Sequence, residues 1–395
     1  MSERIRVAQV VTRFIAGAGG VALRGALALD PDRYEVAILV GSGGRLLDEA
    51  RDAGLEVVMV DHLRPEIAPR DDRQALSELK TLLRQGRFDV VHTHSAKAGT
   101  VGRLAARRVG VPRIVHTFHG FPFHEFQSRP RRAGYVAIEK ALGRFTHAFL
   151  AVGTAVAAEA IRRGIAPPDR IRTIGVAVDT ATPVPTAKER AEARRSLGVP
   201  PGTRVVGTVG RLDYQKAPEH FVEAIARTRR SDVFGVWIGD GPLRADAERL
   251  VGRRGLVGRF SFLGERPDVP ALLPGLDIFA MSSRYEGLPC AVVEAMTAGL
   301  PVVATAVNAV PDVVVPGETG LLVPPGRPDL LARAIAHLLE HPADAARLGA
   351  AGRAALGERL TPAALGRVLD QTYCGVEGDV ELSAIRPYPA LREAV

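Results

Sequence analysis

Two glutamates, Glu286 and Glu294, stand eight residues apart within residues 282–305, and a Gly-Leu-Pro break follows the first of them. A regular helix turns about 80° past two full turns over that spacing, so it could not hold both carboxylates on one face. Proline suits the first turn of a helix, and Pro289 therefore predicts a loop that carries Glu286 and a following helix that carries Glu294. Both carboxylates can then face one cleft from different heights.

The backbone amides between the two glutamates could add to a binding site. Gly287, Leu288 and Cys290 stand at the N-terminus of the predicted helix. Unpaired N–H groups there, together with the helix dipole, attract anionic or oxygen-rich ligands. A surface loop with two solvated glutamates is the alternative, and it would account for either carboxylate alone. The complete string favours a binding site.

Two cations follow another strand-like run, at residues 203–210. Arg211 and Lys216 flank the loop, and Pro218 predicts that a helix begins directly after it. Two cations and a helix N-terminus on one loop would neutralise a diphosphate. The alternative is an arginine and a lysine on a solvated loop.

A glycine-rich turn, Gly17-Ala-Gly19-Gly20, follows the first strand-like run. Glycines permit close packing of a strand against the next helix, a property shared by many sites. The turn lacks the third glycine of a dinucleotide-binding fingerprint, since position 22 is alanine, and the second strand-like run ends in Val-Gly-Ser without an acidic residue. A nicotinamide-dependent dehydrogenase is therefore disfavoured.

Four histidines lie in two neighbouring strand-like runs, His92 and His94 in the first and His116 and His119 in the second. Side chains two residues apart on a strand point to the same side, so only the later of His92 and His94 is expected to reach a site at the strand end. His119 precedes a glycine at the end of its run, which makes it the main candidate. Lys97, shortly after His94, is a further candidate for substrate binding.

A metal site is not expected. The spacing of the histidines matches no metal-binding pattern, and Cys290 and Cys374 stand elsewhere in the sequence. With two cysteines so far apart, a disulfide framework is not expected either.

Short β-branched runs alternate with amphipathic stretches along the chain, which predicts parallel, doubly wound sheets. The expected strands of the first half are residues 5–11, 34–40, 55–60, 88–94, 113–119 and 147–153, and its expected helices include 20–29, 46–53, 72–85 and 99–108. The pattern restarts near residue 204, with expected strands at 203–210, 234–240, 259–264, 276–283, 300–306 and 319–325.

A chain of 395 residues is too long for one ordinary core. The Thr- and Pro-rich residues 179–186 predict a connector, so we expect an N-terminal domain at 1–182 and a C-terminal domain at 183–370. Residues 371–395 are expected to form a tail that crosses back to the first domain. Two facing doubly wound domains bind ligands at the carboxyl ends of their strands, where most of the motifs above fall.

Together these motifs resemble those of the retaining glycosyltransferases of family 4. The resemblance rests on the E-x7-E spacing of Glu286 and Glu294, on the G-R-L-x-x-x-K motif ending at Lys216, and on the His119-Gly pair. It covers nearly the whole chain. It implies an α/β fold of GT-B architecture, in which two Rossmann-like domains face a cleft.

The same resemblance implies roles for individual residues. Arg211 and Lys216 would grip a nucleotide diphosphate, and Glu294 would hold the ribose hydroxyls. Glu286 and the amides of Gly287 and Leu288 would position the transferred hexose.

Further roles follow from the resemblance on the other side of the cleft. His119 would lie near the sugar and the acceptor, with His94 and Lys97 on the acceptor side. Gly19 and Gly20 would approach the donor phosphates from the opposite domain. Arg266 stands where the family contacts the base mostly through backbone atoms.

The resemblance implies a retaining transfer of a hexose or N-acetylhexosamine from a nucleoside diphosphate sugar, most simply a UDP-sugar, without a metal or other cofactor. The combination of HTHSAKAG with HTFHGFPFHEFQ resembles the branch that builds lipid-linked polysaccharides. One departure concerns residues 308–312, Asn-Ala-Val-Pro-Asp, where many members have Gly-Gly before the Pro-Asp/Glu pair. The identity of the donor sugar therefore stays open.

Three alternatives share these motifs or this architecture. A non-hydrolysing UDP-N-acetylhexosamine 2-epimerase would need no acceptor. A natural-product glycosyltransferase would act on a soluble aglycone. A non-catalytic nucleotide-sugar binder would have no need of intact Glu286, Arg211 and Lys216.

The net charge of +8 allows several interpretations. A nucleic-acid binder is disfavoured because no helix-turn-helix, zinc-finger or aromatic-basic motif is present. Attraction to an anionic membrane face that carries the acceptor, and a merely solvated basic surface, both remain open. The N-terminus does not resemble a signal peptide and no apolar run approaches the ~20 residues of a membrane helix. We therefore expect a cytoplasmic protein, either free or peripheral on the inner face of the membrane.

Overall fold

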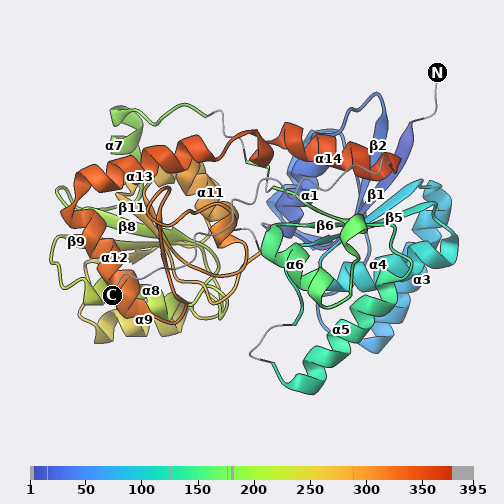
Figure 1. Cartoon of the computed structure of the whole chain (residues 1–395), viewed down its shortest axis with the longest axis horizontal. Helices are drawn as coiled ribbons and strands as arrows, with labels where there is room; N and C mark the ends of the chain where they lie inside the picture. The colour runs from blue at the N-terminus through green and yellow to red at the C-terminus, as the bar shows by residue number, and fades with distance from the viewer. Residues whose placement is uncertain are drawn as a thin grey trace.

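The computed structural model describes residues 4–375, except residues 16, 124–126, 176, 179–181 and 288. Its chain forms two lobes, each built on a sheet covered by helices on both faces (Figure 1). All strand pairs within the two sheets are parallel. The predicted α/β class with two doubly wound sheets is confirmed.

The first lobe contains a seven-stranded sheet with the order β3-β2-β1-β4-β5-β6-β7. Its strands are β1 (Ile5–Phe14), β2 (Tyr34–Gly43), β3 (Glu56–Met59), β4 (Val90–His94), β5 (Arg113–Phe118), β6 (Ala148–Ala151) and β7 (Ile171–Thr173). The helices are α1 (Ala18–Leu27), α2 (Arg45–Asp52), α3 (Pro69–Gly86), α4 (Ala96–Val109), α5 (Arg129–Gly143), α6 (Thr154–Arg162) and the 3-10 turn η1 (Pro168–Arg170). The short edge strand β7 was not predicted, because three residues carry too little pattern.

The second lobe contains a six-stranded sheet with the order β10-β9-β8-β11-β12-β13. Its strands are β8 (Arg204–Val209), β9 (Val233–Ile238), β10 (Phe260–Phe262), β11 (Ile278–Met281), β12 (Val302–Thr305) and β13 (Leu321–Val323). The helices are α7 (Ala187–Ser196), α8 (Pro218–Arg227), α9 (Arg244–Arg253), α10 (Val269–Leu272), α11 (Cys290–Thr297), α12 (Pro328–Glu340) and α13 (Pro342–Ala355), with 3-10 turns η2 (Leu273–Gly275) and η3 (Val310–Asp312). The chain then passes through the 3-10 turn η4 (Glu358–Leu360) into α14 (Pro362–Cys374).

The strand order places the predicted site residues. It reverses direction between β1 and β4 in one sheet and between β8 and β11 in the other, and such reversals leave a crevice at the carboxyl ends of the strands. The glycine-rich turn follows β1 and the histidine run ends β4, whereas the Arg211–Lys216 loop follows β8 and the Glu286 loop follows β11. The motifs thus occupy the reversal point of each sheet.

Helix α14 returns to the first lobe and packs beside α1 (Figure 1). Tyr34 of β2 donates a hydrogen bond to Asp370 of α14, with 2.7 Å between Oη and Oδ1. A Cβ atom on Gly366 would lie only 2.4 Å from the carbonyl oxygen of Ala28, so the two helices pack so closely that only glycine fits at position 366. Of the expected crossing tail, residues 371–374 complete α14 and Gly375 is its C-cap residue, whereas residues 376–395 lie outside the described residues.

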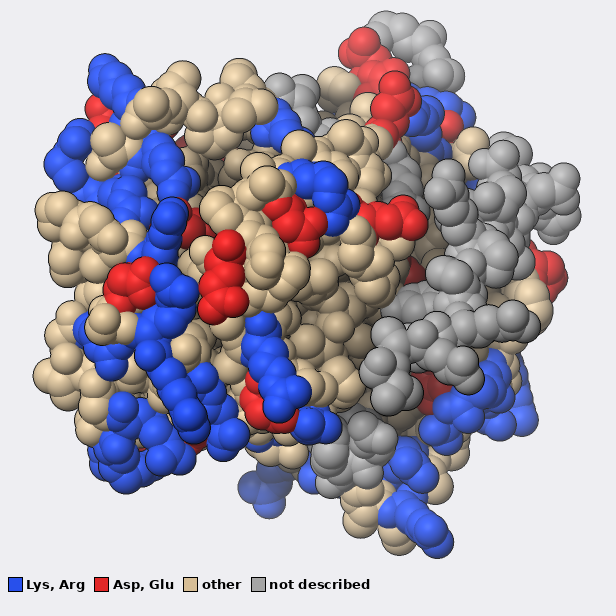
Figure 2. All heavy atoms as spheres, turned by 60° about the vertical axis from the view of Figure 1, so that its left-hand side comes forward, with Lys and Arg blue, Asp and Glu red and all other residues tan. Residues whose placement is uncertain are grey.

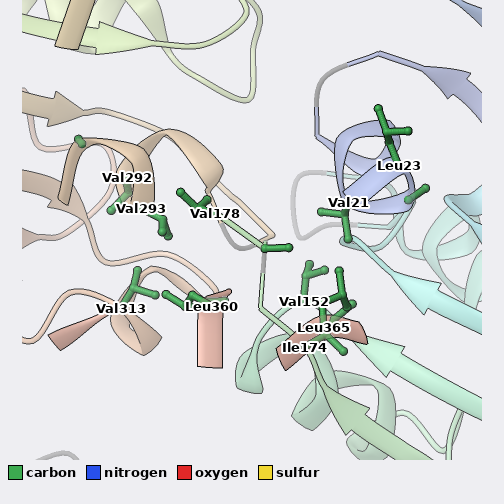
Figure 3. Packing of buried hydrophobic residues seen from close by; sticks show 14 of the residues in the cluster. Val21, Leu23, Val152, Ile174, Val178, Val292, Val293, Val313, Leu360 and Leu365 are labelled. Carbon is green, nitrogen blue, oxygen red and sulfur yellow. The ribbon is translucent and has the colours of Figure 1, made fainter. Parts of the chain in front are cut away.

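Buried apolar residues connect the lobes where the chain passes between them. The amide of Val178 donates to the carbonyl of Leu360 at 2.8 Å, so the two connecting segments hydrogen-bond to each other. Figure 3 shows both residues between Val292 and Val313 of the second lobe and Val152 of the first, all in one hydrophobic cluster. The junction between the lobes is therefore packed, and we call it the interlobe junction.

The surface of the second lobe carries many Lys and Arg side chains with Asp and Glu side chains among them (Figure 2). Several of its arginines pair with a carboxylate two residues away, as Arg230 does with Asp232 and Arg327 with Asp329. Exposed pairs of this kind contribute about 0–1 kcal/mol each. Part of the basic excess is therefore balanced locally. Among the described residues, no helix has the length and apolar content needed to cross a membrane.

The close crossing of α1 and α14 predicts a strong effect of Gly366→Ala. The added methyl group would press on the Ala28 carbonyl, and overpacking of this kind lowers the free energy of unfolding by about 1–3 kcal/mol. Gly252→Ala in α9 is the matched control, because a Cβ there meets open space and alanine favours a helix by up to ~1 kcal/mol. Urea unfolding of both variants measures the difference. Equal stability of the two variants would contradict the close crossing.

Candidate active site

The two glutamates lie where the sequence predicts them. Glu286 stands on the loop after β11, and Glu294 lies within α11, which begins at Cys290 with Pro289 as its N-cap residue. The amide of Glu286 donates to Asn308 Oδ1 at 2.8 Å, which fixes the loop against the segment before η3. Leu288 lies outside the described residues.

The Glu286 side chain forms an ion pair with Lys216. Glu286 Oε1 lies 2.5 Å from Lys216 Nζ, and only 5% of the Glu286 side chain is exposed. Ser283 Oγ donates to the same oxygen at 2.6 Å, and Gln215 Nε2 donates to Oε2 at 3.2 Å. A carboxylate this far from water needs a paired cation, and Lys216 supplies it.

The loop that carries the cations is anchored where it enters α8. Ala217 adopts a left-handed conformation (φ 50°) directly before α8, and Ser282 Oγ donates to the Lys216 carbonyl at 2.9 Å. Arg211 differs from Lys216, because 54% of its side chain is exposed and its nearest carboxylate, Asp213, is 3.7 Å away. Lys216 is thus committed to Glu286, whereas the Arg211 guanidinium faces solvent and can meet an anion.

Glu294 lies close enough to the first lobe to interact with Arg24. Burial raises the pKa of Glu294 above its ordinary value, and the positive charge of Arg24 opposes that rise. Arg24 comes from α1, and its Nη2 lies 3.9 Å from Cys290 Sγ across the interlobe junction. Sequence analysis did not select Arg24, although it stands one helical turn after Gly20.

The glycine-rich turn brings α1 close to β1. Gly17 has φ 71°, and a Cβ on Gly19 would lie 3.0 Å from backbone atoms of Phe14. A Cβ on Gly20 would lie 3.4 Å from Arg24 Nη2, so the Arg24 side chain folds back over this glycine. The small residues therefore allow a cation of the first lobe to lie at the N-terminal end of α11.

His119 and Gly287 meet across the interlobe junction. A Cβ on Gly287 would lie 2.3 Å from the His119 carbonyl oxygen, so only glycine permits this approach. His119 Nε2 lies 2.9 Å from His94 Nδ1, which places His94 behind it within the first lobe. The structure therefore brings His119 to the loop that carries Glu286.

The four candidate histidines are uncharged at neutral pH; His92, His94 and His116 are buried, and His119 is half-buried. Burial lowers the pKa of His119 to about 4 and that of His92 to about 3, and it lowers the pKa values of His94 and His116 well below their ordinary range. As predicted, His92 and His94 point to one side of the sheet, with ring centroids 4.2 Å apart. His116 bonds instead to Thr93, with 2.8 Å between Nδ1 and Oγ1.

Two candidate residues are engaged within their own lobes. Lys97 Nζ lies 2.6 Å from Asp72 Oδ1 of α3, and Arg266 forms a two-pronged pair with Asp268 at 2.8 and 2.6 Å. Within the described ranges, no group of three or more His, Cys, Asp or Glu side chains could hold a metal ion.

The unusual residues 308–312 form a contact that sequence analysis missed. Both carboxylate oxygens of Asp312 accept hydrogen bonds from Thr154 at the N-terminus of α6, and the bond from the Thr154 amide measures 2.6 Å. Asp312 thus caps a helix of the other lobe, where a carboxylate is favourable. Sequence analysis could not find this contact, because a sequence does not show which helix end a carboxylate will meet.

Both halves of the chain match family models. Residues 15–182 match the model "Glycosyltransferase Family 4", and residues 189–355 match "Glycosyl transferases group 1".

Related proteins of known name cover much of the chain. It is 30% identical over 312 residues to the UDP-Gal:alpha-D-GlcNAc-diphosphoundecaprenol alpha-1,3-galactosyltransferase of Escherichia coli, covering 78% of this chain and 80% of that protein. It is 35% identical over 289 residues to the 2-deoxystreptamine glucosyltransferase of Streptomyces kanamyceticus, covering 68% of this chain and 73% of that protein. The crystal structure of Anabaena HepE in complex with UDP and glucose is similar in fold, with a TM-score of 0.84 at 20% identity over 94% of this chain and all of that one.

The buried histidines predict acid-sensitive stability. Between about pH 6.5 and pH 4 the unfolded chain binds protons at His92, His94, His116 and His119 that the folded chain does not bind, so the free energy of unfolding falls as the pH falls. Each histidine contributes up to ~1.4 kcal/mol per pH unit, and above about pH 6.5 these sites contribute no pH dependence.

Urea unfolding at about pH 7, 6 and 5 measures this slope. His116→Gln should make the slope shallower by removing one site. An unaltered slope in His116→Gln would contradict the assignment.

Proposed function

This chain belongs to the GT-B glycosyltransferases, and from that premise we propose that it transfers a hexose or N-acetylhexosamine, with retention of configuration, from a UDP-sugar to a lipid-linked hydroxyl acceptor. The observation that carries the proposal is the buried Lys216–Glu286 pair, which lies at the reversal point of the second sheet and opposite His119 of the first lobe.

The donor nucleotide is assigned to the second lobe. Arg211 and Lys216 hold the diphosphate. Arg211 provides an exposed cation, and Lys216 moves from Glu286 toward the phosphates when the donor binds. Glu294 accepts hydrogen bonds from the ribose hydroxyls, and its partial burial supports this role because a poorly hydrated carboxylate gains most from a pair of hydroxyl donors. The names of the E. coli relative and of the Anabaena complex, which include UDP, support this choice of base.

The two domains divide the substrates between them in this proposal. Residues 183–370 bind the donor, and residues 1–182 bind the acceptor, with His94 and Lys97 on that side. Gly19 and Gly20 leave room for the donor phosphates at the interlobe junction. Arg266 contributes to the base site through its backbone, in keeping with the engagement of its side chain by Asp268.

The chemistry follows from the charges at the junction. The bond between the anomeric carbon and the diphosphate breaks, the electron pair leaves with the diphosphate, and the two cations stabilise that charge. The amide of Gly287 and the carboxylate of Glu286 hold the sugar while its anomeric carbon becomes cationic. The acceptor hydroxyl attacks from the face that the diphosphate leaves, and its proton passes to the departing diphosphate, the nearest base on that face.

The contacts of Glu286 support a binding role over a nucleophilic one. Lys216, Ser283 and Gln215 donate hydrogen bonds to its two oxygens, so the lone pairs of both oxygens are already engaged. A carboxylate nucleophile would have to break these bonds to reach an anomeric carbon. Same-face attack without a glycosyl-enzyme intermediate needs no such rearrangement.

Two classes of acceptor are candidates. The E. coli relative acts, by its name, on a diphosphoundecaprenol, which favours a lipid-linked acceptor reached from a membrane surface. The Streptomyces relative acts on 2-deoxystreptamine, and its 35% identity makes a soluble aglycone the second candidate. Both relatives are transferases, which disfavours the epimerase and the non-catalytic binder.

The test is a mass-spectrometric screen of the purified protein against UDP-, GDP- and ADP-sugars, with and without membrane lipid extract. Transfer that depends on one UDP-sugar and on lipid supports the proposal. Transfer to a soluble aminocyclitol would move the assignment to the second candidate. Donor epimerisation without an acceptor, or a donor other than a UDP-sugar, would contradict it.

Lys216→Ala should lower the transfer rate on the order of 10²-fold, because a cation is removed from the developing charge and Glu286 loses its partner. Lys188→Ala is the matched control, since it removes an exposed lysine from α7 and should leave the rate unchanged. Steady-state rates with the identified donor measure both. Equal rates in the two variants would remove Lys216 from the mechanism.

A further inference from the structure

A continuous row of hydrogen bonds runs from His119 through the interior of the first lobe to α14. His119 Nε2 lies 2.9 Å from His94 Nδ1, and His94 Nε2 lies 2.5 Å from Gln9 Oε1 of β1. Gln9 Nε2 then donates to Tyr373 Oη at 2.9 Å. Except for the half-buried His119, these side chains are fully buried. Strands β1 and β4, the residue that follows β5, and helix α14 thus share one polar row.

The Gln9 amide gives this row a direction. Its nitrogen donates to Tyr373, so its oxygen accepts, and the only donor that can supply this bond is a protonated Nε2 on His94. His94 is neutral because its burial disfavours a charge, and its Nδ1 therefore carries a lone pair. That lone pair accepts a hydrogen bond from His119, which must be protonated at Nε2.

The other branch of the row agrees with this direction. Tyr373 accepts from Gln9, so its own proton is available for His92 Nδ1, which lies 2.7 Å away. His92 is neutral, so its Nε2 then carries the single N–H proton of the ring and donates to Thr117 Oγ1 at 2.6 Å. Turning the Gln9 amide by 180° would reverse each of these bonds and move the His119 proton from Nε2 to Nδ1.

We propose that Gln9 and Tyr373 are positioning residues that hold His119 in its Nε2-protonated tautomer, so that His119 Nδ1 accepts a hydrogen bond from a hydroxyl of the sugar bound beside Gly287. The inference rests on the proposed function, which brings a sugar to the junction where the His119 carbonyl meets Gly287. No described residue hydrogen-bonds to His119 Nδ1, so this nitrogen is the one left for a substrate.

The tautomer has a consequence for substrate selection. A lone pair at Nδ1 suits a sugar that offers a hydroxyl proton, and it opposes a carboxylate or carbonyl oxygen at the same place. Discrimination by an unpaired polar group is strong when that group is buried away from water. The row therefore favours a neutral hexose over a hexuronic acid at this position.

The first measurement is the 15N NMR spectrum of the full-length protein labelled at histidine, read without any substrate. The His119 signals are identified by their loss in His119→Ala. Wild-type protein should show Nδ1 as the unprotonated nitrogen and Nε2 as the protonated one. The opposite pattern would overturn the proposal, whether or not the protein proves to be a glycosyltransferase.

Two variants test what fixes the tautomer. Gln9→Met removes the acceptor for His94 and should turn the single His119 tautomer into a mixture. Tyr373→Phe leaves Gln9 in place but removes the partner of its nitrogen, so the amide can turn and a mixture should again appear. Thr93→Val is the control, because it removes the buried hydrogen bond between Thr93 of β4 and His116 of β5 without touching the row, and it should keep the wild-type His119 signals. A single unchanged tautomer in both variants would overturn the proposal.

Kinetics separate this inference from the proposed function. With the donor found in the screen, Gln9→Met and Tyr373→Phe should lower kcat by about tenfold, since a lost or misdirected hydrogen bond in the reacting complex has this size. The dissociation constant for UDP should stay within about twofold, because the nucleotide is bound by the other lobe. Wild-type protein that fails to transfer would refute the proposed function alone. Wild-type kcat in both variants would refute the role of the row.

Discussion

The ion pair between Lys216 and Glu286 is the constraint on which the site depends. Because the carboxylate is 5% exposed, it needs a fixed cation, and the cation must come from the loop of the adjacent strand. The two loops are accordingly tied together by further bonds, such as that from the Arg284 amide to the Gln215 carbonyl at 2.8 Å. A diphosphate can compete with Glu286 for Lys216, because Ser283 and Gln215 still donate hydrogen bonds to the Glu286 carboxylate. Donor binding therefore need not leave this buried carboxylate without a partner.

A second constraint on the site is the close approach of the two lobes, which glycines at the interlobe junction permit. Gly287 admits the His119 carbonyl, and Gly153 admits Asp312 to the N-terminus of α6, since a Cβ there would lie 2.8 Å from Asp312 Oδ2. Both contacts need glycine on one lobe and a polar group on the other. They hold the lobes together around the loop of Glu286, and exclusion of water from such a junction would limit hydrolysis of a bound donor.

The sequence predicted most of the architecture because each buried strand is a local pattern. Runs such as VFGVWI of β9 are buried throughout, and the motif residues stand at their ends. It also placed Glu286, Glu294, Arg211 and Lys216 on the correct loops and helix. It could not predict Arg24, Gln9 or Asp312, because their partners lie 85 or more residues away in the chain and depend on how the lobes and the return helix dock. The short strand β7 was missed for want of a pattern.

Helix α14 makes both apolar and polar contacts with the first lobe. Its apolar face packs on α1, with Leu369 against Gly25, and the same face carries Tyr373 into the polar row. A buried hydroxyl must find both a donor and an acceptor, and Gln9 and His92 provide them only if α14 docks in one register. The requirement that each buried polar group be satisfied thus links the docking of the C-terminal helix to the protonation pattern of a histidine at the interlobe junction. In this way α14 completes the first lobe and also supplies the partner of Gln9 on which the proposed tautomer of His119 depends.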